Sequence, residues 1–272
     1  MRRRGWPWAL AAGVICALSL APFAWLVLAS FKTPLEITAI PPAPWPSGGL
    51  ESYHSALSRF GLGRFVLNSL IVAGATTLGS LALGTGAAYA LARLRLPGRP
   101  WLMGGLLLVS MFPQISLAGP IWRMLQAAGL LNTHLGLIIP YITLTLPLAV
   151  WILTSYFSEL PRELEEAALL DGCGRLGALW RVILPLAGPG LFTAAILVFI
   201  YAWNEFFFAL LIMTRRSVQT LPVGIAMFQG QYTMPWGEIA AASTVATVPL
   251  VVLVFLFQRR IVGGLSAGAI KG

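Results

Sequence analysis

Side chains that could perform acid–base or metal chemistry are few in this chain of 272 residues, and they are unevenly placed. Five of the nine acidic residues lie in the segment Ser158–Pro185, and one, Glu205, lies well inside an apolar run. The two histidines, His54 and His134, are isolated, so we expect no metal site. A membrane-embedded enzyme would need acids, histidines or cysteines gathered at one depth. We therefore expect no catalytic residue.

The elements that carry these residues are apolar. The chain is 58% hydrophobic and only 10% charged, whereas soluble domains carry about 25% charged residues. A membrane-spanning helix needs about 20 mostly apolar residues, and six runs qualify: Trp8–Ser30, Phe65–Ala92, Trp101–Gly119, Leu135–Phe157, Leu186–Met213 and Glu238–Phe257. We predict an all-α integral membrane protein with six transmembrane helices, forming a single transmembrane domain over residues 1–272.

The distribution of basic residues predicts how these spans are oriented. With both termini placed inside, twelve of the eighteen Lys and Arg residues fall on the cytoplasmic side, which leaves six outside. The positive-inside rule then places both termini and the segment Ser158–Pro185 in the cytoplasm. Two sizeable segments lie outside: the proline-rich Phe31–Arg64, with a short helix expected near Leu50–Leu57, and Thr214–Gly237.

The segment Ser158–Pro185 joins the fourth and fifth spans and cannot lie in hydrocarbon, because charges there are costly. Pro161 suits the first turn of a helix, and the glutamates that follow favour the positive end of the helix dipole. Glycines then break this helix, and we hypothesise that Gly172 needs a positive φ. A second helix is predicted over Arg175–Ile183, ended by Pro185. The pattern indicates a helix-turn-helix elbow.

The elbow has two apolar faces, which are Leu164, Ala167 and Ala168 on the first helix and Leu176, Leu179, Trp180 and Ile183 on the second. An amphipathic linker lying on the bilayer would show such faces. A helix that docks on another protein would also show them, because small side chains let a partner's backbone come close. The residues alone leave both interpretations open.

Glu205 is an ionisable residue within a span, and such residues are candidates for function. With Trp203 and Asn204 it could bind a polyol, because aromatic faces and polar groups suit such solutes. Alternatively, Asn204 and Glu205 form hydrogen bonds between helices and hold a pair of subunits together. We favour this second interpretation.

Two further polar residues lie in the spans. Gln114 follows Pro113 in the third span, where we expect a simple kink in preference to a broken helix. Tyr141, in the fourth span, is equally suited to hydrogen bonding between helices and to lining a solute pathway.

One motif of the elbow consists of Glu166-Ala167-Ala168, then Gly172 after three residues, and Val182-Ile183-Leu184-Pro185 after nine more. It resembles the EAA loop of binding-protein-dependent ABC importer permeases, which have Ile where this chain has Val182. Further segments resemble the carbohydrate branch of that family, and most closely the maltose- and trehalose-type second permease subunit. These segments are Ser30–Lys32, Leu67–Leu70, Ala88–Arg93, Met111–Pro113, Trp203–Phe206 and Gly264–Gly272.

The resemblance implies a non-catalytic permease subunit in the cell membrane of a bacterium or archaeon. A second permease subunit would complete a heterodimer, and two ATPase subunits would bind ATP and Mg, so that this chain holds no cofactor. An extracytoplasmic sugar-binding protein would deliver the cargo. The other partner is membrane lipid, and no nucleic acid is expected. The segment Thr214–Gly237 occupies the place of the outer loop that enters the binding protein's cleft in the maltose system.

The resemblance also assigns roles to residues. Those expected to couple to the ATPase are Glu166, Ala167, Ala168, Asp171, Gly172, Leu184 and Pro185, and those expected to reach between the ATPases are Gly268, Ala269, Ile270, Lys271 and Gly272. The expected cargo is a di- or oligosaccharide such as trehalose or maltose. Glycerol phosphate or another polyol is an alternative. A self-sufficient secondary transporter is less favoured, because neither paired intramembrane charges nor repeats are visible.

Overall fold

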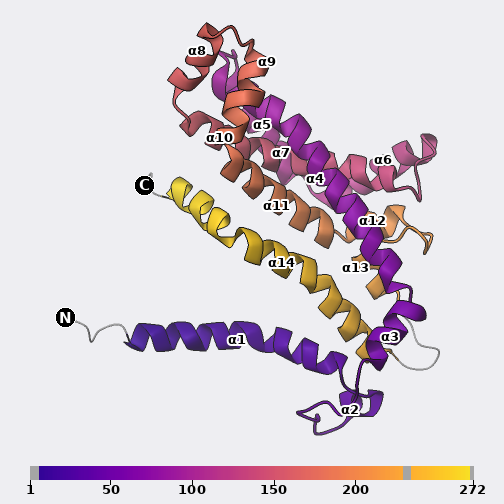
Figure 1. Ribbon diagram of the computed structural model, residues 1–272. Helices are drawn as coiled ribbons and strands as arrows, with labels where there is room; N and C mark the ends of the chain where they lie inside the picture. Colours follow the sequence, from indigo (N-terminus) through magenta and orange to yellow (C-terminus); the bar gives the residue numbers. More distant parts are fainter. Residues whose placement is uncertain (1–5, 229–233, 270–272) are drawn as a thin grey trace. The chain divides into compact units, whose positions relative to one another are not determined.

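The computed structural model describes residues 6–228 and 234–269, with side chains through residue 257, and these residues fold into helices without strands (Figure 1). Four helices are long and apolar enough to cross a membrane: α1 (Trp6–Ser30), α4 (Leu62–Arg93), α7 (His134–Glu159) and α14 (Trp236–Ala269). Two bent pairs of helices raise the number to six if each pair counts as one span: α5 (Arg99–Met111) with α6 (Gln114–Ala127), and the end of the elbow (Arg175–Leu186) with α11 (Gly188–Asn204). The predicted all-α membrane fold is confirmed.

The third apolar run is broken, so the expectation of a simple kink is wrong. Helix α5 (Arg99–Met111) ends before Phe112 and α6 (Gln114–Ala127) begins after Pro113, with 90° between their axes. Phe112 and Pro113 are both extended, with ψ values of 132° and 117°. Proline causes this, because it donates no hydrogen bond and disfavours helical geometry in the residue before it.

The fifth run is also discontinuous, where one span over Leu186–Met213 was predicted. Helix α11 (Gly188–Asn204) stops at Glu205, whose ψ of 129° is extended, and α12 (Phe207–Ile212) follows. Apolar composition does not reveal this stop, because the run is apolar on both sides of Glu205, whose carboxylate caps α12.

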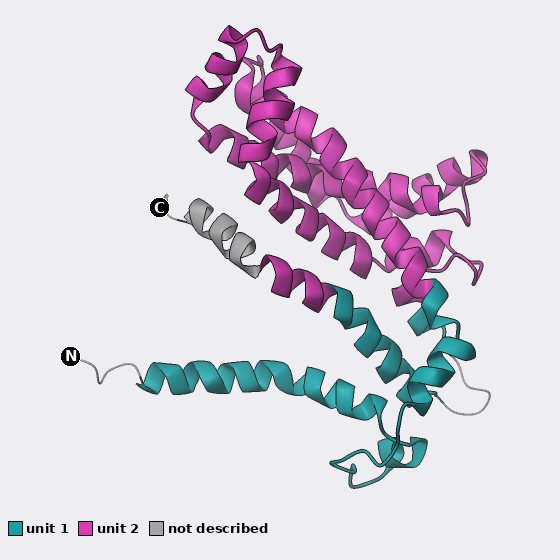
Figure 2. Ribbon diagram, in the orientation of Figure 1, with its two compact units in different colours: residues 1–64, 224–249 teal, residues 65–223, 250–272 magenta. Residues whose placement is uncertain are grey.

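The described chain forms two compact units, and each is described by itself (Figure 2). Residues 1–64 and 224–249 make up the first unit, and residues 65–223 and 250–272 make up the second. That all 272 residues act as one transmembrane domain stays a prediction.

The first unit contains the two short helices α2 (Pro34–Thr38) and α3 (Glu51–Ser58), the second of which confirms the helix expected near Leu50–Leu57. A capping box between Thr33 and Glu36 starts α2. Helix α3 is attached to the end of α1 through a 2.8 Å hydrogen bond between the hydroxyls of Ser30 and Tyr53. The Ser55 hydroxyl also donates to the Glu238 carboxylate of α14 at 3.1 Å.

The second unit has its core where α4, α7 and α11 meet the elbow. The buried residues of this core are Ala88, Tyr89, Ala92, Leu153, Phe157, Leu179, Ile183, Ala187 and Ala194. Helix α4 also lies close to α7 further along. A Cβ added to Gly79 would come within 2.5 Å of the Ile142 side chain, and the hydroxyls of Ser80 and Thr145 lie 2.7 Å apart. Small residues of this kind let membrane helices approach closely.

Candidate functional site

The elbow consists of α8 (Arg162–Leu170), a turn, and a second helical stretch formed by α9 (Arg175–Ala178), a π-helical turn (Leu179–Ile183) and α10 (Leu184–Leu186). This stretch passes through Pro185, so the prediction that Pro185 ends it is wrong. Within a regular helix the proline ring would clash with the carbonyl four residues earlier. The wider π turn, in which the Leu184 N–H donates to the Leu179 carbonyl, accommodates the proline.

Gly172 closes α8 in a left-handed conformation, with a φ of +83°, and the hypothesis of a positive φ is confirmed. Its N–H donates to the Leu169 carbonyl at 3.1 Å, and the next N–H, of Cys173, donates to the Ala168 carbonyl at 3.0 Å. These two bonds make a complete Schellman cap. A Cβ at Gly172 would meet no atom within 4 Å. Backbone conformation is therefore the reason for glycine here, and not lack of space.

The predicted apolar faces of the elbow each divide between the core and the surface. On α8, Ala168 is buried while Leu164 and Ala167 are exposed. In the second stretch, Leu179 and Ile183 are buried, whereas Leu176 and Trp180 are 71% and 62% exposed.

The remaining residues of the EAA-like motif lie mostly on the outside. Glu166, Asp171, Gly172 and Pro185 are exposed, and Leu184 is half-buried. Leu170, which lies on the same face of α8 as Glu166, is 89% exposed. The outer surface of the elbow thus presents large apolar side chains beside carboxylates, an arrangement that suits a protein partner.

The inner side of the elbow is attached to α4 by polar contacts that sequence reasoning missed. The Tyr89 hydroxyl donates to Glu165 Oε1 at 2.5 Å, and Arg93 Nη2 donates to the Leu160 carbonyl at 2.9 Å. Arg93 Nε lies 3.7 Å from Glu165 Oε2, with only 2% of the Arg93 side chain exposed. Buried charges persist only where they are paired and hydrogen-bonded. The sequence feature that could have indicated these contacts is a tyrosine and an arginine four residues apart at the end of a span.

Glu205 lies at the junction of α11 and α12, and it is buried. Its carboxylate accepts hydrogen bonds from the N–H groups of Phe208 and Ala209, at 2.9 and 3.2 Å, and from the Tyr141 hydroxyl. Tyr141 belongs to α7, so the carboxylate both caps α12 and joins two helices of this chain. Trp203 is buried beside it.

Asn204 does not join this network. Its side chain is exposed, and its amide donates to the Ile200 carbonyl of its own helix at 2.8 Å. Among the described residues, Asn204 therefore makes no side-chain hydrogen bond to another helix.

Gln114 lies at the break between α5 and α6, where its Nε2 donates to the Tyr201 hydroxyl at 2.6 Å. Both residues line a cavity of about 340 Å³ whose wall also includes Ser110, Phe112 and Trp151. Hydroxyl and amide groups beside aromatic rings are typical of the walls of small-molecule sites.

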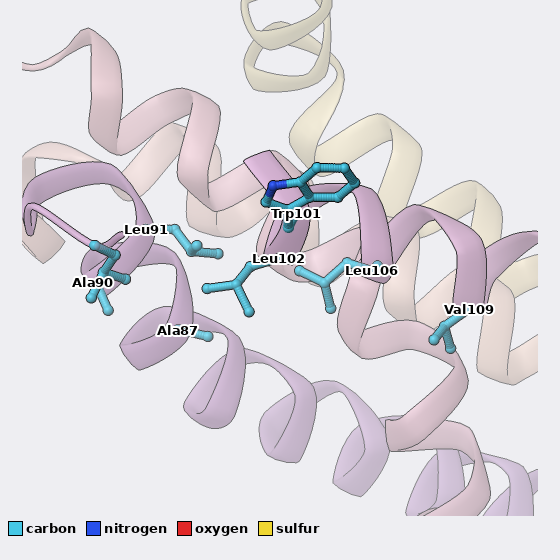
Figure 3. Close-up of a pocket in the computed structure, with 9 residues that line it drawn as sticks. Ala87, Ala90, Leu91, Trp101, Leu102, Leu106 and Val109 are labelled. Carbon is cyan, nitrogen blue, oxygen red and sulfur yellow. The ribbon is translucent and has the colours of Figure 1, made fainter. Parts of the chain in front are cut away.

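A larger groove of about 570 Å³ runs between α4 and α5, and Figure 3 shows its lining. Ala87, Ala90 and Leu91 of α4 contribute to it, and Leu102 and Leu106 of α5 do so as well. The lining is almost entirely apolar, so this groove offers little to a polyol.

The predicted tail lies largely beyond what the structure describes. Gly268 and Ala269 are the last residues of α14. Ile270, Lys271 and Gly272 lie outside the described residues.

Known proteins resemble this chain along nearly its whole length. Residues 80–266 match the family described as binding-protein-dependent transport system inner membrane component. The trehalose/maltose transport system permease protein MalG of Thermococcus litoralis is 44% identical over 97% of this chain and 95% of its own length. The sulfoquinovosyl glycerol transport system permease protein SmoH of Agrobacterium fabrum is 42% identical over 97% and 93%, respectively.

A solved structure shares the fold. It is a chain of a bacterial ABC transporter involved in the import of the acidic polysaccharide alginate. The two chains superpose with a TM-score of 0.79 at 20% sequence identity, covering 94% of this chain and 95% of that one.

Proposed function

The chain belongs to the family of binding-protein-dependent transport system inner membrane components and is a non-catalytic permease subunit of an ABC importer; from this premise we propose that its cargo is a di- or oligosaccharide such as trehalose or maltose. The relative from Thermococcus litoralis supports this cargo by its 44% identity. The Agrobacterium relative, at 42%, supports sulfoquinovosyl glycerol as a second candidate.

The importer would contain a second permease subunit as heterodimer partner, two ATPase subunits that bind ATP and Mg, and an extracytoplasmic sugar-binding protein. The family's dependence on a binding protein supports the last of these. Both termini and the elbow would be cytoplasmic, in agreement with the positive-inside rule. The tail residues Gly268–Gly272 would reach between the ATPases.

The outer surface of the elbow would dock on an ATPase subunit. The single observation that carries this proposal is the exposure of large apolar side chains on the elbow: Leu170 on the same face of the capped helix α8 as Glu166, and Leu176 and Trp180 on the second stretch. Closure of the ATPase dimer on ATP binding would then move the elbow as one body. That movement would switch the spans between two packed states without continuous bending.

The solute-facing surface of this subunit would include Gln114 at the break between α5 and α6, together with Tyr201 and Trp151. The cavity that these residues line supports this role. Glu205 and Tyr141 would instead stabilise the packing of the helices, because their polar atoms bond to each other and to α12. Trp203, which is buried, would share that structural role.

A co-purification experiment tests the function. The chain is expressed with its neighbouring genes, purified in detergent and reconstituted in liposomes. ATP hydrolysis is measured with binding protein that is empty or loaded with trehalose, maltose or sulfoquinovosyl glycerol. We expect one loaded form to stimulate hydrolysis and thereby to identify the cargo. Purification of this chain alone, with solute movement that does not require ATP, would overturn the proposal in favour of a secondary transporter.

A further inference from the structure

We propose that α4 is a rigid connecting helix that transmits the state of the elbow to residues 214–221, which are the loop after α12 and the first residue of α13 (Leu221–Ala226), at the opposite end of α4. The proposal rests on the proposed docking of the elbow on an ATPase. It assigns positioning roles to Tyr89 and Arg93 at one end of α4 and to Asn68 and Ser69 at the other. All of these residues belong to the second compact unit.

At the elbow end, three contacts attach α4 to both sides of the α7–α8 junction. Tyr89 and Arg93 lie four residues apart, on one face of α4. They bind Glu165, in the middle of α8, and the carbonyl of Leu160, the residue that follows α7. Because two separate points of the elbow are held, α8 can neither rotate nor slide relative to α4 without breaking partly buried hydrogen bonds.

At the opposite end, α4 binds the loop that follows α12. The Asn68 side-chain amide donates to the Ser217 and Gln219 carbonyls at 3.1 and 2.9 Å. The Ser69 hydroxyl accepts from the Leu221 N–H at 2.8 Å. Asn68 and Ser69 are 4% and 3% exposed. Each of these bonds is made to a backbone group of this segment. They therefore fix the path of its backbone independently of its side chains.

The Asn68 side chain is itself held in position. Its Oδ1 lies 3.0 Å from Nε2 of His134, the first residue of α7. With its amide on two carbonyls and its oxygen beside the imidazole, Asn68 connects α4, α7 and the loop. An apolar residue of similar size would leave the two loop carbonyls without these donors.

Between its two ends α4 is continuous and supported. It contains 32 residues and no proline, which gives a length of about 48 Å at 1.5 Å per residue. The close approach at Gly79 and the Ser80–Thr145 hydrogen bond fix it against α7 near its middle. A continuous helix held in this way passes on a displacement of one end to the other.

The consequence is a two-way connection. ATP-driven movement of the elbow would shift residues 214–221, which open the segment expected to meet the binding protein. By thermodynamic reciprocity, a binding protein that holds those residues would bias the elbow and the ATPases beneath it. Cargo loading outside the cell would thus reach the site of hydrolysis through the subunit that this chain forms.

The first test removes one hydroxyl at the elbow end. Tyr89→Phe deletes the donor to Glu165, and Tyr156→Phe is the matched control, because the buried Tyr156 hydroxyl has no hydrogen-bond partner in the part of the chain that the structure describes. Both variants are assembled with their partners and compared by co-purification and thermal melting. We expect Tyr89→Phe to reduce the stimulation of ATP hydrolysis by loaded binding protein roughly fivefold or more, with basal hydrolysis and assembly retained. Tyr156→Phe should leave the stimulation unchanged.

The second test reads the distant loop directly. Ser217 is exposed, so Ser217→Cys, in a chain carrying Cys16→Ser and Cys173→Ser, can be labelled with a maleimide. In the assembled complex we expect a non-hydrolysable ATP analogue to change the labelling rate. Tyr89→Phe and, independently, Asn68→Ala should reduce that change, because each removes one attachment of α4 while Arg93 or Ser69 keeps another.

The outcomes separate this inference from the proposed function. If the parent complex shows no hydrolysis stimulated by binding protein, the proposed function fails. If the parent is stimulated and its Ser217→Cys labelling responds to nucleotide equally with and without Tyr89→Phe and Asn68→Ala, the function stands and α4 is not the connecting element.

Discussion

The turn at Gly172 offers the sharpest test of the elbow as a rigid coupling element. Its φ of +83° is one that residues with a Cβ rarely adopt. Since a Cβ would meet nothing within 4 Å, replacement introduces a conformational cost and no steric clash. For an ordinary L-residue this cost is about 1–2 kcal/mol, and for β-branched valine it is larger. A change of about 1–2 kcal/mol in the free energy of the turn alters the ratio of elbows with the native turn to elbows with another turn conformation roughly five- to thirtyfold.

The expected result is a graded loss of coupling. Gly172→Val should assemble with its partners and hydrolyse ATP, but transport less sugar for each ATP consumed. Gly172→Asn should be close to the parent, because asparagine tolerates the left-handed region. Gly174→Ser is the matched control in the same turn: Gly174 has a φ of −68° and open space around it, and serine is a favourable residue at the start of a helix.

The assay measures sugar uptake and phosphate release in the same proteoliposomes, after co-purification has shown that the complex is intact. Wild-type coupling in Gly172→Val would refute the reasoning that the left-handed turn sets the angle of the elbow. Equal loss in Gly172→Val and Gly174→Ser would also refute it, because the effect would then not depend on φ.

Four further predictions concern separate parts of the chain. Trp180→Ala should weaken ATPase co-purification without lowering the melting temperature of the permease pair. Glu205→Ala should lower that melting temperature, because each buried donor left unpaired costs about 1–3 kcal/mol, whereas Glu205→Gln should lower it less. Gln114→Leu should raise the sugar concentration needed for half-maximal uptake at unchanged basal hydrolysis. Hydrogen bonds, first of all from Ser47, lower the pKa of Glu36 below 4.5; the stabilisation of this turn should therefore be present at neutral pH and be lost as the pH falls through that lowered pKa, as amide exchange of Ser47 would show.

The sequence could predict the features that depend on local pattern. Apolar run length located the spans, and the order of proline, glutamates and glycine located α8 and the left-handed Gly172. The break at Pro113 was also visible, but whether a proline kinks or breaks a helix depends on what surrounds it. Here the helix breaks, and the axes of the two helices on either side of Pro113 make an angle of 90°.

The contacts that organise the site were beyond such reasoning, because they join residues far apart in the chain. Tyr89 and Glu165 are separated by 76 positions, and Asn68 and Ser217 by 149. The cap at Glu205 is local, because its carboxylate accepts from N–H groups only three and four positions further along the chain, but it was equally hard to predict. A single acid in an apolar run indicated function or interhelical bonding, but its role as a cap for α12 depends on N–H groups that become available only when the helix has already broken.

The exposed surface of the elbow helps to decide between the two interpretations that its residues left open. Amphipathic helices that lie on a bilayer carry Lys and Arg on their polar face, where they meet anionic lipid. Helix α8 carries Glu163, Glu165 and Glu166 against one arginine, and the exposed Leu170 lies on the same face as Glu166. Burying that leucine in the membrane would bring the carboxylate toward negatively charged headgroups. A cleft in a protein, with its own basic and apolar groups, can accept both side chains together, so the charge pattern of α8 favours a docking helix over a surface linker.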